Sequence, residues 1–239
     1  MPAILALETS SPVLSVALKS PKGKVFSHSL SGLLNHSENL LPIMDKLLKK
    51  AKISIGDVEI FLIDRGPGSF TGLRAGFASL KGFLAVEEKE CYGAISLDLI
   101  AENANLPEKS KLAVCLDARR EKIYFRLYER KNRKWHPLTE LDVMTVQEVL
   151  SKLPREVFIT GDALARYKNT FQEKQGKKKF HFLAEKTWYP LAEALIDFHE
   201  NRRSALKRLK GPNLLPLYFR LSEAEEKRQE NKKQHANSC

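Results

Sequence analysis

The chain has few cysteines and no long apolar run, and both absences narrow its class. Its 239 residues include only Cys91, Cys115 and Cys239, too few and too scattered for a disulfide framework or a zinc knuckle. No apolar stretch approaches the roughly 20 residues of a membrane helix. The N-terminus shows no basic segment followed by a cleavage site. We therefore expect a cytoplasmic protein without membrane contact.

Motifs of self-sufficient catalysis are also missing. The six histidines form no His-x-x-x-His pair, and none stands at ligand spacing from a cysteine, so no metal site is expected. There is no Gly-x-Ser-x-Gly element of the kind that serine hydrolases use. The sequence therefore predicts no catalytic residue in this chain.

What the chain has in excess is positive charge, with a formal net charge of +11. Residues 1–105 are neutral, with 11 Lys/Arg and 11 Asp/Glu. Residues 106–167 hold 13 against 9, and residues 168–239 hold 16 against 9. This excess favours a polyanionic partner, nucleic acid first, or a solubilising surface with a basic tail. Charge alone does not separate these two interpretations.

The hydrophobic pattern repeats one order of elements twice. Three strand-like segments, a helix, a strand and a second helix cover residues 3–86, and the same order returns from residue 111 to residue 171. A duplicated βββαβα unit predicts the α/β actin-like (ribonuclease H-like) architecture, which by itself does not fix a function. We expect a first lobe over 1–105, a second over 106–221 and a basic, flexible tail over 222–239. Within the second lobe we expect a helix from about Leu191 to Leu209 and a strand or arm over Leu214–Leu221.

Two turns stand where the phosphate-binding hairpins of that architecture would lie. The first contains Glu8, Thr9 and Ser10, and the second begins with Asp117. Together they form the candidate nucleotide cleft. Neither turn has a glycine, which would let the backbone approach a phosphate, so nucleotide hydrolysis by this chain alone is disfavoured.

A glycine-rich corner links the strand that ends near Asp64 to the next helix. Ser69 or Thr71 is expected to cap that helix. A plain turn is favoured over an anion site, since no Gly-Lys-Ser/Thr closes the corner. We interpret it as a rigid hinge that aims the helix at a partner. The motif corner consists of Gly66, Pro67, Gly68, Ser69, Phe70, Thr71 and Gly72.

The helix after the corner has small residues beside its apolar face. Positions 72, 75, 76, 78, 79 and 82 are Gly, Ala or Ser, at spacings that let another helix approach closely. They could pack against the helix over 37–52 inside the lobe, form a seam with another subunit, or do both.

Several segments, in the same order along the chain, resemble the bacterial TsaB (YeaZ) family. The most specific is Gly66-Pro67-Gly68-Ser69-Phe70-Thr71-Gly72-Leu73-Arg74. Others are Ile4-Leu5-Ala6-Leu7-Glu8-Thr9-Ser10, His36-Ser37 with Leu40-Leu41-Pro42, Ala94-Ile95-Ser96-Leu97-Asp98, and Pro216-Leu217-Tyr218-Phe219-Arg220. The segment between Thr139 and Pro212 matches much less well.

The resemblance implies a non-catalytic scaffold and activator subunit that helps to make threonylcarbamoyladenosine next to the tRNA anticodon. It implies pairing with a TsaD-type catalytic subunit, which carries the metal-binding histidine pair, and with a TsaE-type ATPase. The chain would bind no cofactor alone, ATP would act in the complex, and tRNA would be reached through the complex. Free protein of this family also tends to form a homodimer through the same surface.

By this resemblance, the helices over His36–Ala51 and Thr71–Val86 form the seam with the catalytic subunit. The residues expected there are His36, Leu41, Met44, Leu48, Arg74, Ala75, Ala78, Ser79 and Gly82. Two alternatives stay open: a stand-alone metallopeptidase-like or ATPase enzyme of the actin-like fold, and a tRNA-binding module that uses the basic second half.

Overall fold

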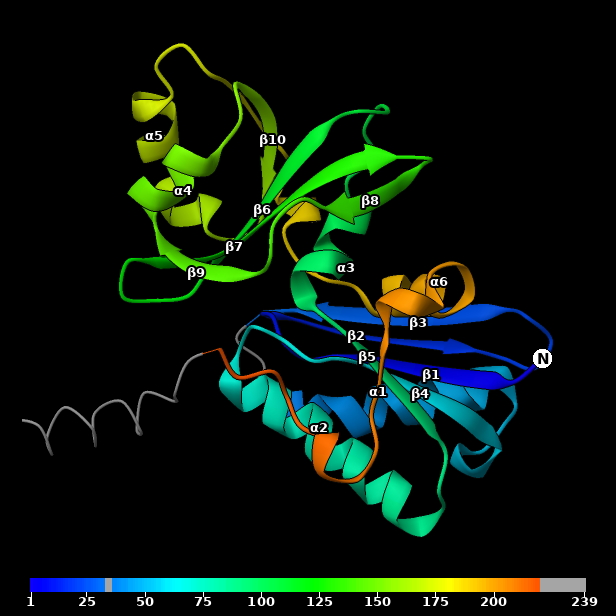
Figure 1. The fold of residues 1–239 in the computed structure, drawn as a ribbon. Coiled ribbons are helices and arrows are strands. Elements are labelled where there is room, and N and C mark those ends of the chain that lie inside the picture. Colours follow the sequence, from blue (N-terminus) through cyan, green and yellow to red (C-terminus); the bar gives the residue numbers. More distant parts are fainter. Residues whose placement is uncertain (33–35, 220–239) are drawn as a thin grey trace, which may run out of the picture.

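The chain folds into two lobes, each built on one sheet (Figure 1). The structure is a computed structural model that describes residues 1–32 and 36–219. Within those residues, no helix is both long and apolar enough to cross a bilayer.

The first sheet has the strand order β12-β5-β4-β1-β2-β3. Strands β1, β4 and β5 run parallel, whereas β2, β3 and β12 are antiparallel to their neighbours. Its strands are β1 (Ala3–Glu8), β2 (Val13–Lys19), β3 (Val25–Ser31), β4 (Val58–Asp64), β5 (Glu90–Ala94) and β12 (Lys207–Arg208). Its helices are α1 (His36–Ala51) and α2 (Phe70–Val86), with a short 3-10 turn over Ile55–Asp57. Pro42 is exposed and lies inside α1, which begins at His36 and therefore does not start at the proline.

The second sheet has the order β11-β10-β6-β7-β8, and β9 also pairs with β7. Its strands are β6 (Lys111–Asp117), β7 (Lys122–Lys131), β8 (Lys134–Pro137), β9 (Asp142–Thr145), β10 (Glu156–Thr160) and β11 (Lys179–Phe182). Its helices are α4 (Val146–Lys152) and α5 (Leu164–Lys174). Two strands of the second sheet occupy the position that β3 has in the first. Strand β8 pairs with one end of β7, and β9 pairs with the other end. Apart from this division and the additional edge strand β12 of the first sheet, the two sheets share one topology, which confirms the predicted duplicated actin-like fold.

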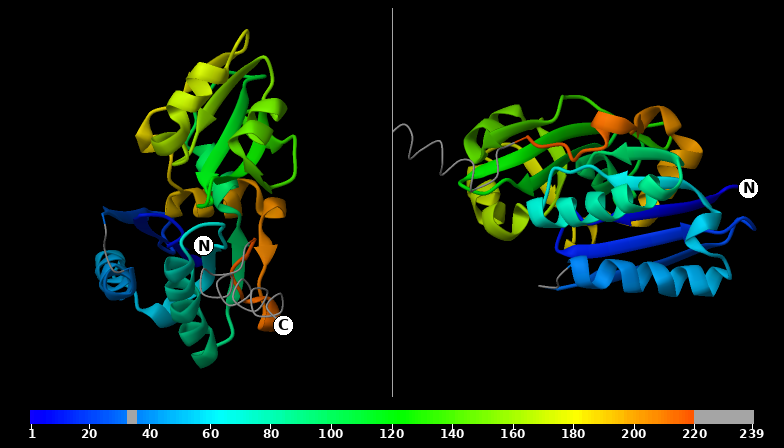
Figure 2. Two further views of the ribbon diagram at one scale, coloured as in Figure 1. Left: turned by 90° about the vertical axis from the view of Figure 1, so that its left-hand side faces the viewer. Right: turned by 90° about the horizontal axis from the view of Figure 1, so that it is seen from below.

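The lobes exchange one helix each. After β5, helix α3 (Ser96–Glu102) packs on β6, β7 and β8 of the second sheet. After β11, helix α6 (Ala192–Asn201) packs on β1, β2 and β4 of the first. Figure 1 shows α6 on one face of the first sheet and α1 and α2 on the opposite face, and Figure 2 gives two further views of this layering.

This exchange changes the expected division of the chain. The segment from α6 to residue 217 packs on the first lobe, not on the second as the boundary at 221 implied. The helix ends at Asn201 rather than near Leu209, and β12 follows as a short edge strand. Residues 214–219 form an arm without a strand, and the expected tail lies outside the described residues. Because residues 222–239 hold four Lys/Arg and four Glu, calling that tail basic was wrong.

Both faces of the first sheet are covered, which explains why β1 is apolar from Ala3 to Leu7. Leu5 and Leu7 pack with α1 and α2, whereas Ile4 and Ala6 pack with α6. A strand buried on both faces reads as a continuous apolar run instead of an alternation. The polar residues that follow such strands are thereby carried to the sheet's carboxyl edge, where ligands bind in open α/β sheets.

Candidate functional site

A buried polar network lies where β1 and β4 end and α3 begins. Ser10 Oγ is 2.6 Å from Glu8 Oε1 and 2.8 Å from Asp64 Oδ2. Ser96 Oγ donates to Asp64 Oδ1 at 2.8 Å, and the Gly66 N–H donates to the same oxygen at 2.8 Å. The Ser10 N–H donates to Glu8 Oε1 at 2.6 Å. Glu8 and Asp64 are fully buried, so the network is sealed from solvent.

The network holds protons that free carboxylates would lose. Burial, together with the charge of Asp64, raises the pKa of Glu8 well above its usual value. Burial raises the pKa of Asp64 from 3.8 to about 6. A single hydroxyl proton on Ser10 serves only one of the two carboxyl oxygens that it contacts, so the other contact requires a protonated carboxyl group. Glu8 and Asp64 therefore favour sharing a proton across Ser10.

The start of α2 packs directly against the turn that carries this network. The Ser69 N–H donates to the Ser10 carbonyl oxygen at 2.6 Å. A Cβ on Gly68 would lie 2.1 Å from that same oxygen, and a Cβ on Gly72 would lie 2.0 Å from the Thr9 carbonyl oxygen. Glycine is thus required at both positions by close backbone approach. Of the two predicted caps, Ser69 is the one used, since its Oγ accepts from the Gly72 N–H.

The rest of the motif corner ties α2 to distant segments. Gly66 accepts from the Ser96 N–H, and the Leu217 N–H donates to the Arg65 carbonyl oxygen. Pro67 is buried and Thr71 is exposed. The ring of Phe70 lies 5.0 Å from that of Tyr218, and the guanidinium of Arg74 stacks on Phe70 at 3.9 Å. The corner is therefore a packed joint between α2 and the C-terminal arm.

The second lobe has a matching turn that stays nearer to solvent. Asp117 ends β6, and its carboxylate accepts from the Arg119 N–H at 2.8 Å. Asp162, just after β10, accepts from the Asp117 N–H at 2.8 Å. Burial, reinforced by Asp117, raises the pKa of Asp162 to about 6. The hydrogen bonds of Glu8 stay within the first lobe and those of Asp117 within the second, so no hydrogen bond joins the two predicted halves of a nucleotide cleft.

The predicted seam residues divide between surface and core. Leu41 on α1 is 51% exposed, whereas Met44 is 2% exposed and belongs to the core. On α2, the residues at 74, 78 and 82 are exposed, and those at 75 and 79 are half-buried. Leu48 is also half-buried, and His36 Nε2 lies 2.8 Å from the Ser11 carbonyl oxygen. Gly72 and Gly76 face Thr9 rather than solvent. The stripe of small, exposed or half-buried residues on α2 is thus Ala75, Ala78, Ser79 and Gly82, with the exposed Arg74 on the same helix.

Metal-ligating side chains are dispersed over the described residues. Within residues 1–32 and 36–219, no three His, Cys, Asp or Glu side chains lie together as a metal ion would require. Cys91 and Cys115 are buried, and burial raises the pKa of the Cys91 thiol to about 12. Neither cysteine has the character of a nucleophile.

Asp64, Ser96 and Asp162 were not predicted as site residues. Each follows a strand that the fold brings to the carboxyl edge of its sheet. The usable signal was a polar residue at the end of a strand or within two residues after it.

Comparison with known proteins assigns the chain to a family. The family model that matches is TsaD, described as tRNA N6-adenosine threonylcarbamoyltransferase, over residues 33–201. The chain belongs to this family. Within it the chain is of the TsaB (YeaZ) type, which confirms the resemblance found in the sequence.

Individual relatives cover most of the TsaB-type chain. The tRNA threonylcarbamoyladenosine biosynthesis protein TsaB of Bacillus subtilis is 27% identical over 233 residues, covering 96% of this chain and 99% of that protein. The Escherichia coli protein of the same name is 31% identical over 135 residues, covering 56% and 58%. The solved structure of YeaZ from Pseudomonas aeruginosa has a TM-score of 0.75 at 24% identity, covering 92% of this chain and all of that one. It shares the fold.

Proposed function

We propose that this chain is the non-catalytic scaffold and activator subunit of a complex that makes threonylcarbamoyladenosine in tRNA. Its family and the names of its curated relatives support the pathway. Its partner would be a TsaD-type catalytic subunit, joined by a TsaE-type ATPase. The chain would bind no cofactor by itself, ATP would act at the level of the complex, and tRNA would reach it through the complex.

One observation carries the non-catalytic assignment. The turn after β1 is filled by the start of α2, through the Ser69–Ser10 backbone bond and the contact of Gly72 with Thr9. Glu8, Thr9 and Ser10 are buried, and Ser10 is occupied by the two carboxyl groups. A phosphate needs free backbone N–H groups and space at such a turn. Here the Ser10 N–H is bonded to Glu8, and the start of α2 fills the space at the turn.

The exposed stripe on α2 supports the partner assignment. A helix face of alanine, serine and glycine lets a second helix approach closely, and a Cβ added to Gly82 would meet no atom within 4 Å. Leu41 adds an exposed apolar side chain from α1, which contacts α2. Small side chains on this face allow a second helix to pack against α2 at a short interaxial distance.

The test is a bulky substitution on the stripe. Ala78→Trp should abolish co-elution with the TsaD-type subunit, because the indole would hold the helices apart, and should lower threonylcarbamoyladenosine in the tRNA of a complemented depletion strain. The matched control is Ala165→Trp, at an exposed alanine on α5. If Ala78→Trp co-elutes as the unaltered chain does, the seam assignment is wrong.

A nucleotide-hydrolysing enzyme is the second candidate, since Asp117 keeps a partly exposed carboxylate at the carboxyl edge of the second sheet. Steady-state ATP turnover by the purified chain, lost in Asp117→Ala, would favour it over the scaffold role. Absence of turnover would remove it.

A further inference from the structure

The positive charge of the protein resides mainly in the second lobe. Residues 106–190, which form that lobe's sheet, α4 and α5, hold 19 Lys/Arg against 11 Asp/Glu. Residues 1–105 and 191–219 hold 16 Lys/Arg against 14 Asp/Glu. The residues at 33–35 are uncharged and do not affect this count. The tail over 222–239 is neutral by sequence. A polyanion would therefore be attracted to the second lobe.

Three segments bring five of these cations to one end of the lobe. They are the end of α4, the start of β10, and α5 with the turn into β11. Lys178 Nζ donates to the carbonyl oxygens of Leu150 and Leu153, both at 2.8 Å, and the Lys179 N–H donates to the Arg155 carbonyl oxygen at 2.7 Å. We define the distal basic cluster as Lys152, Arg155, Lys174, Lys177 and Lys179, all of them exposed.

No ion pair within the described residues involves the cluster, although Glu148 and Glu173 lie near it. None of its five side chains forms an ion pair with any residue in the described ranges. Glu156, the nearest acid in sequence to Arg155, pairs instead with His181 at 3.2 Å. Cations that lie together add their potentials, and a nucleic acid that binds them releases cations condensed on its own phosphates.

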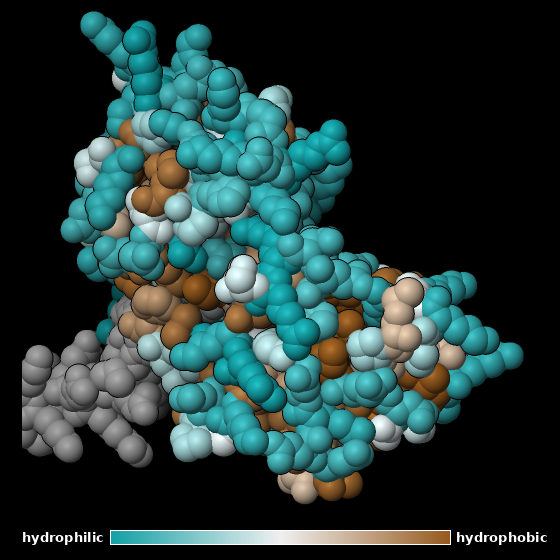
Figure 3. All heavy atoms as spheres, turned by 45° about the vertical axis from the view of Figure 1, so that its right-hand side comes forward, coloured by the Kyte–Doolittle hydropathy of each residue, from teal (hydrophilic) through white to brown (hydrophobic). Residues whose placement is uncertain are grey.

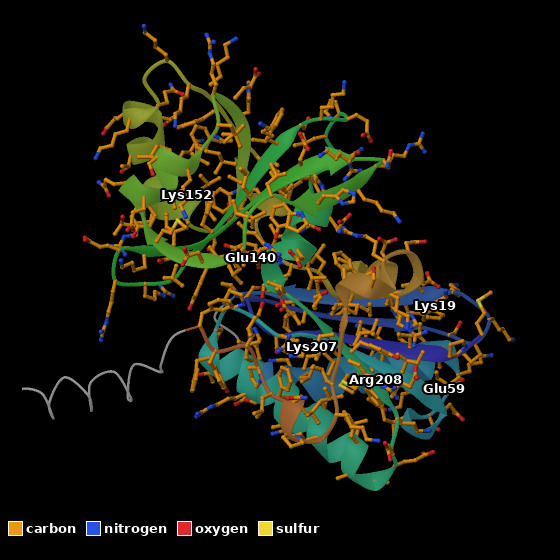
Figure 4. All side chains as sticks on the ribbon, viewed as in Figure 1. Lys19, Glu59, Glu140, Lys152, Lys207 and Arg208 are labelled. Carbon is orange, nitrogen blue, oxygen red and sulfur yellow. The ribbon has the colours of Figure 1, made fainter. Side chains whose placement is uncertain are left out.

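The cluster also lies away from the stripe proposed for the catalytic partner. In Figure 1 the α5–β11 connection is at the top of the upper lobe, whereas α2 lies in the lower lobe. Figure 3 shows hydrophobic side chains at the waist between the lobes and a mostly hydrophilic upper lobe, and Figure 4 labels Lys152 on that lobe. A partner on α2 would leave the cluster free.

We propose that the distal basic cluster binds the phosphodiester backbone of RNA. Taking the partner to be tRNA rests on the proposed function, but the surface itself rests on charge and geometry. Lysine heads act as point charges toward phosphates and do not read bases, so this contact would add affinity and orientation without sequence preference.

The test compares two triple variants of the full chain in binding unmodified tRNA from 50 to 200 mM salt, by fluorescence anisotropy. Lys174→Gln, Lys177→Gln and Lys179→Gln together should weaken binding about tenfold or more at 100 mM salt and reduce the salt slope by about 3, roughly one per lost phosphate contact. The matched control removes three exposed lysines elsewhere, through Lys22→Gln, Lys24→Gln and Lys207→Gln. It should bind as the unaltered chain does. Circular dichroism and melting temperature establish that both variants fold.

Equal losses in the two triple variants would overturn the proposal, since the effect would then be net charge alone. So would a cluster variant that keeps its tRNA affinity while losing affinity for vesicles containing phosphatidylglycerol, which would assign the cluster to an anionic membrane surface. Co-elution of each variant with the TsaD-type subunit is measured in parallel. Normal co-elution with unaltered tRNA binding refutes the RNA contact alone, whereas failed co-elution of the unaltered chain refutes the scaffold role alone.

Discussion

The two lobes carry the same turn at the carboxyl edge of the sheet and treat it in opposite ways. In the first, Glu8 caps the Ser10 N–H and is sealed by α2. In the second, Asp117 caps the Arg119 N–H and stays partly exposed. Three consecutive residues after Asp117, namely Arg119, Arg120 and Glu121, have φ of 62°, 48° and 59°, whereas the first turn has no residue with positive φ.

The difference shows that the two copies of the duplicated unit use the same turn for different structural purposes. Where α2 must approach the strand closely, glycines and a buried acid network replace an open turn. In the second lobe the turn keeps charged residues in a left-handed backbone conformation that suits them poorly. In the first lobe the turn is therefore a rigid, packed contact that supports the start of α2.

The largest expected effect breaks that joint. Gly72→Ala should lower the free energy of unfolding by about 3 kcal/mol or more, because the new Cβ would lie 2.0 Å from the Thr9 carbonyl oxygen. Urea denaturation measures it. The matched control is Gly82→Ala on the same helix, where nothing lies within 4 Å and alanine should stabilise by up to about 1 kcal/mol. Similar results for the two variants would contradict the close approach.

Acidity provides a second comparison, since both lobes bury a carboxyl group with a pKa near 6. For Asp64 and Asp162 the folded-state pKa is above the ordinary 3.8. Stability from each is therefore fully present below about pH 4 and is lost as the pH rises through about 6, by on the order of 3 kcal/mol for the sealed Asp64. Unfolding free energies between pH 4 and pH 7 should flatten in Asp64→Asn, and to a smaller extent in Asp162→Asn. A pH profile that neither substitution changes would rule out the shifts.

A smaller effect is expected from the hydroxyl between the two acids. Ser10→Ala should cost about 2 kcal/mol, because it removes the hydroxyl partner of the buried Asp64 Oδ2 and one of the two partners of Glu8 Oε1. Ser29→Ala is the control, since Ser29 also bonds a serine hydroxyl but is exposed on β3. Thermal melts of both variants give the comparison. A loss at Ser29 as large as that at Ser10 would argue against a special role for burial.

The smallest effect concerns the second turn. Glu121→Gly should stabilise the protein by up to about 1 kcal/mol, because glycine adopts a φ of 59° without steric cost. Glu140→Gly, at an exposed site without positive φ, should be neutral or destabilising. Differential scanning calorimetry resolves the sign. If both changes lower the melting temperature, the turn is not strained.

Sequence patterns predicted the elements whose signals are local. The strands around Leu5 and Leu62 and the helix after Ser69 are all present. The patterns did not predict β9, β11 and β12, because strands of two to four residues carry too little periodicity.

For the candidate site, the motif corner was identified but not its chemistry. The Ser10–Asp64 bond spans 54 residues and the Ser10–Ser96 contact spans 86, so neither follows from local spacing. The burial of Met44 was missed for a related reason: which side of an amphipathic helix faces the sheet depends on the neighbours that the fold supplies. Whether the remaining stripe contacts a catalytic subunit stays a prediction.

The exchange of helices between the lobes affects the order in which the lobes can fold while the chain is synthesised. While the chain is being made, the first sheet has α1 and α2 from residues 36–86, but the face formed by Ile4, Ala6 and Leu62 waits for α6 at residues 192–201. More than a hundred residues must therefore leave the ribosome while that apolar face has no cover of its own. The second lobe, which receives α3 before its own strands emerge, can complete first. The half of the protein that is translated first would be the last to finish folding.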